Sequence, residues 1–169
     1  KGTATVDEAF PGQIEKWRET LAKNLALRND SLSVRELNEA VQKTIDRLVF
    51  LRICEGRGIE SAYRLQGAAN GDNIYERLRQ IFREADDRYN SGLLHLQKEK
   101  EREEPPDTFT HGIAIADTRM RTIISSMYSP TPAFDFTVLP VALHGPEAGQ
   151  VLTTTAHLPP HPPPNTRRR

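Results

Sequence analysis

The chain has 169 residues, enough for one domain with a modest core. Its 23 lysines and arginines balance 23 aspartates and glutamates, which excludes a protein that acts wholly through a polybasic or an acidic tail. No apolar run reaches the roughly 20 residues that a membrane span needs, and the single cysteine, Cys54, excludes an intramolecular disulfide framework and fits the reducing cytoplasm.

Two helices are predicted before residue 60. Apolar residues recur every three or four positions from about Asp7 or Gln13 to Arg28 and indicate the first helix. They are Ile14, Trp17, Leu21 and Leu25. Ser33 and Glu36 have the spacing of a capping box, which predicts the start of a second helix that ends near Arg57, next to two glycines.

Arg52 and Glu55 lie on the core-facing side of this second helix. At 100° per residue Arg52 falls on the apolar stripe, and Glu55 lies about one turn further along the same side. Because a lone buried charge is costly, we expect the two side chains to pair with each other or with a third group. The favoured interpretation is a structural ion pair that locks neighbouring helices. The other is a polar anchor for a partner or a DNA strand.

Helical patterns continue after residue 70. We expect a third helix to start at a cap on Asn73, and a solvated helical extension to run from Leu93 through a dense charge run to Glu104. Asp117 is predicted to cap a shorter fourth helix. After two prolines, the alternation of Phe134–Val138 predicts a strand or an extended segment.

The predicted fold class is mainly α, an antiparallel bundle of three to four helices. Its divisions are a helical bundle over 1–104, then a linker with a short helix and an extended segment over 105–141, and a disordered tail over 142–169. The tail is rich in proline and ends in three arginines, so it lacks the backbone donors and the apolar bulk to join a core.

No familiar catalytic motif occurs: the chain lacks a phosphate loop, G-x-G-x-x-G, H-E-x-x-H and G-x-S-x-G. We therefore assign no catalytic, cofactor-binding or metal-ligating residue. Arg79 and Arg83 lie one helical turn apart and are weak candidates for contacts with the DNA backbone. Carboxylates such as Glu76 and Glu84 are interleaved with them, and a salt-bridged surface is the alternative.

Five motifs stand in a characteristic order between Phe10 and Val141. They are Leu37-Asn38 followed by RLVFLRICEGRGIE at 47–60, YERL at 75–78, YNSGLL at 89–94, MYSP at 127–130 and FDFTVLPV at 134–141. As an ordered set they resemble the helical region of the type IIG restriction-modification enzymes and of the related phage-exclusion (BREX) methylases. Those enzymes carry an adenine-specific DNA methyltransferase in the same chain.

The resemblance implies an inter-domain helical connector from a site-specific DNA adenine-N6 methyltransferase of a restriction or phage-defence system, which acts in the cytoplasm. Its partners would be the adjacent nuclease and methyltransferase domains and, through the parent enzyme, DNA. S-adenosylmethionine would be the cofactor of the parent. The alternative is a stand-alone helical protein-interaction module with no enzymatic parent.

The chain departs from the family pattern after Val141. An out-of-frame reading of the gene would produce such a switch, which we hold as a hypothesis, and the start at Lys1 leads us to expect a fragment. The nuclease residues, the cofactor loop and the Asn-Pro-Pro-Tyr motif of such methyltransferases are absent. No catalytic residue carries over, and we expect the chain alone to be inactive.

Overall fold

The computed structural model describes residues 6–89, 93–96, 103 and 105–128. The described helices are α1 (Val6–Arg28), α2 (Val34–Gly56), α3 (Arg64–Ala68), α4 (Ile74–Tyr89) and α5 (Asp117–Ser126). The predicted mainly α class is confirmed, and no β-strand occurs among the described residues. The predicted extended segment 134–138 and the predicted tail 142–169 lie outside the described residues.

The first two helices form a hairpin, and the predicted capping box is present at the start of α2. The backbone N–H of Glu36 donates to Ser33 Oγ at 3.2 Å, and the Ser33 N–H donates to the Glu36 carboxylate at 2.8 Å. These two bonds satisfy amide groups that the first turn of a helix leaves without partners. At the other end the backbone turns through Gly58, whose φ of 71° suits glycine.

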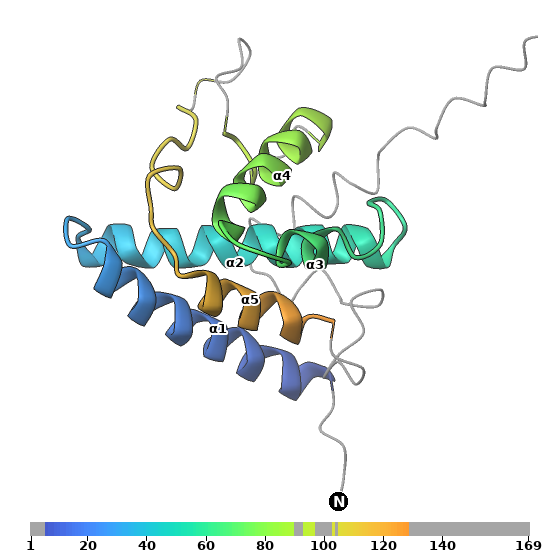
Figure 1. Cartoon of the computed structure of the whole chain (residues 1–169), viewed down its shortest axis with the longest axis horizontal. Helices are drawn as coiled ribbons and strands as arrows, with labels where there is room; N and C mark the ends of the chain where they lie inside the picture. Colours follow the sequence, from blue (N-terminus) through green and yellow to red (C-terminus); the bar gives the residue numbers. More distant parts are fainter. Residues whose placement is uncertain (1–5, 90–92, 97–102, 104, 129–169) are drawn as a thin grey trace, which may run out of the picture.

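Helix α2 is the central element of the fold. Figure 1 shows it crossing the width of the molecule, with α1 and α5 on one side and α4 on the other. Every residue from Arg47 to Glu55 except Arg52 is buried, as expected for a helix that is apolar on nearly all sides. Any polar group in this stretch must therefore find its partners inside the protein.

Helix α5 shares the core of the other helices. Met120, Ile123, Ile124 and Met127 are all at most 1% exposed and belong to the same apolar cluster as Trp17 of α1. The indole N–H of Trp17 also donates to Ser126 Oγ at 2.9 Å. This bond joins the first and last described helices.

The N-terminus of α4 is capped by a residue from another helix. The predicted cap was Asn73, and Asp117 was expected to cap its own helix. Instead the Asp117 carboxylate accepts the backbone N–H groups of Asn73 and Ile74, each at 2.9 Å, while α5 begins without a side-chain cap. The carboxylate thus satisfies α4 from across the helix interface, where its charge also suits the positive end of the helix.

The helical extension predicted from Leu93 is wrong for residues 93–96, which form a turn and irregular backbone. Leu94, His95 and Leu96 are buried, and the Leu96 N–H donates to the Asp86 carboxylate at 2.8 Å. The segment folds back onto the core because these contacts replace the bonds of a helix. The charge run that follows lies outside the described residues except for Glu103. The five-residue helix α3 was not predicted.

Candidate functional site: buried polar networks and surface arginines

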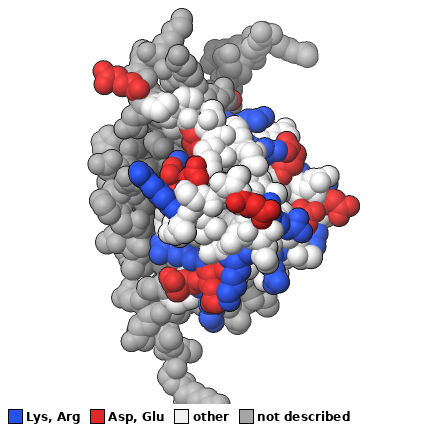
Figure 2. All heavy atoms as spheres, turned by 90° about the vertical axis from the view of Figure 1, so that its left-hand side faces the viewer, with Lys and Arg blue, Asp and Glu red and all other residues white. Residues whose placement is uncertain are grey.

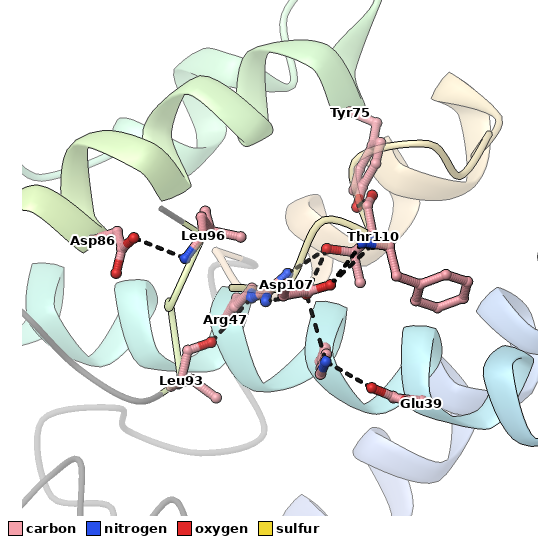
Figure 3. A network of polar contacts seen from close by, with 10 residues as sticks. Glu39, Arg47, Tyr75, Asp86, Leu93, Leu96, Asp107 and Thr110 are labelled. Carbon is pink, nitrogen blue, oxygen red and sulfur yellow. Dashed lines mark hydrogen bonds and ion pairs between the residues drawn. The ribbon is translucent and has the colours of Figure 1, made fainter. Parts of the chain in front are cut away.

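Arg47 of α2 carries one of the most deeply buried charges among the described residues, with 2% of the residue exposed. Its guanidinium donates to the Asp107 carboxylate at 2.6 Å, to Thr110 Oγ1 at 2.8 Å and to the Leu93 carbonyl at 3.1 Å (Figure 3). A buried arginine is tolerated only when a counter-ion and acceptors surround it. Here they come from two loop segments far along the chain.

The Asp107 carboxylate accepts several hydrogen bonds besides that of Arg47. Its carboxylate accepts the backbone N–H groups of Phe109 and Thr110, both at 3.1 Å, and the Thr110 hydroxyl at 2.8 Å. Burial alone would raise the pKa of Asp107, but the hydrogen bond and charge of Arg47, helped by Thr110, outweigh it and lower the pKa to about 2. The carboxylate is therefore ionised throughout the neutral range.

The network extends to α4 and to the surface of α2. The Tyr75 hydroxyl donates to the Thr110 carbonyl at 2.8 Å. Lys43 of α2 lies 3.7 Å from Asp107 and 2.7 Å from Glu39. We call Lys43, Arg47, Tyr75, Asp107 and Thr110 the Arg47 network. It fixes α2, α4 and the loop around residue 107 relative to one another.

A second buried carboxylate, Glu60, holds the loop between α2 and α3. Its side chain is 2% exposed, pairs with Arg64 at 2.6 Å and Arg88 at 2.5 Å, and accepts the Tyr89 hydroxyl. Burial opposes ionisation, yet the hydrogen bonds from Tyr89 and Arg64 and the charges of the two arginines lower the pKa of Glu60 overall. These residues, the Glu60 network, attach the loop to the C-terminal half of α4.

The predicted pair Arg52 and Glu55 meets at a third residue, Tyr128. Glu55 is buried and accepts the Leu65 N–H at 2.9 Å and the Tyr128 hydroxyl at 2.5 Å. Arg52 is half-buried, donates from Nε to the Met127 carbonyl at 3.2 Å, and places its guanidinium 4.6 Å from the centroid of the Tyr128 ring. Both side chains therefore contact the segment that follows α5.

The two candidate DNA contacts differ in their surroundings. Arg79 pairs with Glu76 and donates to the carbonyl of His111. Arg83 is exposed and forms no ion pair with any residue that the structure describes. On the face drawn in Figure 2, acidic and basic side chains are interspersed, and neither sign forms a continuous patch. This arrangement does not resemble an extended DNA-binding surface.

Other chemistry is sparse in the described part of the chain. Burial raises the pKa of the Cys54 thiol to about 12, so this cysteine is a poor nucleophile. Among the residues described, no three histidine, cysteine or carboxylate side chains gather as a metal site would require. None of the helices described combines the length and the apolar character needed to cross a bilayer.

Sequence reasoning missed the residues that carry the two networks: Arg47, Asp107 and Glu60. Arg47 directly precedes the apolar end of α2, and an arginine there must have buried partners. Asp107 follows two prolines and precedes Thr110, a spacing suited to a carboxylate that bonds its own loop. These two signals existed, but nothing in the sequence connects them.

Comparisons with known proteins relate the chain to part of a larger enzyme. No protein-family model and no solved structure matches the chain. A curated relative is the type II restriction enzyme and methyltransferase RM.Eco57I of Escherichia coli, which is 31% identical over 134 residues. The match covers 79% of this chain and 12% of the relative, so the chain spans about an eighth of that protein's length. The chain is therefore related to part of a restriction-modification enzyme.

Proposed function

We propose that the chain is a helical connector between domains of a site-specific DNA methyltransferase that modifies adenine N6, within a restriction-modification or phage-exclusion system. The observation that carries this proposal is the match of 79% of the chain to 12% of a protein named as both restriction enzyme and methyltransferase. A segment of this size is a small part of a chain that must also accommodate two activities.

The packing of the described helices suits a connector. A connector positions its neighbours only if it does not deform, and two buried networks attach loops to helices here. The Arg47 network fixes the loop around residue 107, and the Glu60 network fixes the loop before α3. Buried charge pairs of this kind strongly penalise rearrangement, because separating them leaves an uncompensated charge inside the protein.

The parent enzyme would transfer a methyl group from S-adenosylmethionine to the target adenine in the cytoplasm. In this proposal the chain holds neither the cofactor nor the adenine. Its partners are the domains on either side, one a methyltransferase and the other a nuclease, and DNA reaches it through them.

The first test is the DNA that flanks the coding region. We expect codons for Asn-Pro-Pro-Tyr downstream, in one of the three frames, because that motif holds the flipped adenine in such methyltransferases. Their absence from every frame would favour the stand-alone helical interaction module instead.

The second test is calorimetry with S-adenosylmethionine at micromolar concentration. The 169-residue chain should show no saturable binding, whereas a protein extended through the downstream frame should bind. Saturable binding by the 169-residue chain would contradict the connector role.

A further inference from the structure

Two arginines and a histidine come together where α4 meets the 109–112 turn. Arg79 and Arg83 lie one turn apart and share a face of α4. The guanidinium of Arg79 donates to the backbone carbonyl of His111, which places the turn against the same face. The Tyr75 hydroxyl, one turn before Arg79, bonds the neighbouring carbonyl of Thr110 and fixes the turn in this position.

Some polar groups of this cluster have no partner among the described residues. Glu76 pairs with Arg79, and Asp87 lies one turn beyond Arg83 on α4. Arg83 has no ion pair within the described part of the chain. Arg79 Nε and His111 Nε2 are both covered and have no hydrogen-bond partner in the described part of the chain. Burial, followed by the charges of Arg83 and Arg79, lowers the pKa of His111, as expected where positive charge gathers.

We propose that Arg83, Arg79 and His111 form a binding site for a phosphate oxyanion. Arg83 makes the direct contact, because its exposed guanidinium can donate two parallel hydrogen bonds to phosphate oxygens. Arg79 is kept in place by Glu76 and the turn, and it adds charge beside the contact. His111, whose backbone carbonyl accepts from Arg79, belongs to the turn beside them. This site adds a direct DNA contact to the proposed function. It rests on that function only for the identity of its ligand, the DNA backbone.

The site is tested on the full chain, in a background where Arg167, Arg168 and Arg169 are replaced by glutamine so that the terminal arginines do not bind the probe. Histidine ring signals are followed by NMR during titration with inorganic phosphate. The His111 signals should shift with saturation. Arg83→Ala should weaken the apparent phosphate affinity at least about fivefold, since it removes a charge-assisted contact. The matched control is Arg119→Ala, which removes an exposed arginine from α5.

A second titration uses a DNA duplex at several salt concentrations. Removing one phosphate contact should make the log–log salt slope less steep by about 0.9, so Arg83→Ala should show that change and Arg119→Ala should not. A response to phosphate without duplex binding would support the site and reject DNA as its ligand. The site is refuted if His111 responds to neither probe, or if Arg119→Ala weakens binding as much as Arg83→Ala. The sequence of the flanking DNA tests the connector independently, so either proposal can fail alone.

Discussion

Replacing Asp107 with asparagine tests whether charge holds the Arg47 network together. The variant keeps the shape of the side chain and one carbonyl acceptor, but Arg47 loses its buried counter-ion. The fall of the Asp107 pKa from 3.8 to about 2 corresponds to about 2 kcal/mol of folding free energy at neutral pH. Removing one partner of a buried pair costs about 3–5 kcal/mol. We therefore expect a loss of about 3 kcal/mol at pH 7.

The pH dependence of this loss follows from the sign of the pKa change. The folded-state pKa lies below the unfolded value, so the stabilisation is complete above about pH 4 and disappears as the pH falls toward 2. Urea unfolding followed by circular dichroism at pH 7, 5, 4 and 3 measures it. The parent and Asp107→Asn should converge at low pH. Asp30→Asn, in the exposed turn between α1 and α2, is the control and should change stability by less than about 0.5 kcal/mol. A gap below about 1 kcal/mol at pH 7, or one that stays constant down to pH 3, would refute the charge-based account.

Three further predictions address other parts of the fold. Glu60→Gln should lower the free energy of unfolding by about 1–3 kcal/mol, because a neutral amide cannot balance two arginines; an unchanged thermal midpoint would contradict this. Asp117→Ala should lower the free energy of unfolding by about 1 kcal/mol and speed hydrogen exchange at the amides of Asn73 and Ile74. Unchanged exchange at these two amides would show that another group protects them. Cys54 should resist iodoacetamide at pH 8 until the chain is unfolded, since its pKa is about 12; rapid labelling of the native protein would show that the helix is not packed as described.

Local features were predictable from the sequence because neighbouring residues determine them. The capping box of Ser33 and Glu36 and the buried face of α5 depend on residues within a few positions of each other. The cap of α4 was wrongly assigned because Asn73 is suited to that role, whereas Asp117, 44 positions away, performs it. Helix periodicity shows which residues share a face of one helix. It does not show which carboxylate of another helix will cap its N-terminus.

The buried charges show the same limit. Arg52 and Glu55 were selected because they are near each other on one helix. Arg47 is the more deeply buried arginine, and its counter-ion Asp107 lies 60 positions away. The resemblance to restriction-modification enzymes came from the order of short motifs, so it indicated kinship without indicating which side chains meet.

The bond between Trp17 and Ser126 makes Trp17 an intrinsic fluorescent probe of folding. Trp17 is the only tryptophan, it is 3% exposed, and its indole N–H bonds a hydroxyl at the end of α5, 109 positions along the chain. Its fluorescence therefore reports on the docking of α5, while the far-ultraviolet signal reports on total helix. A contact between residues so far apart in the sequence closes a large loop and therefore costs chain entropy. We expect it to form late in folding. If α5 docks after the α1–α2 hairpin has formed, fluorescence will lag behind ellipticity during refolding.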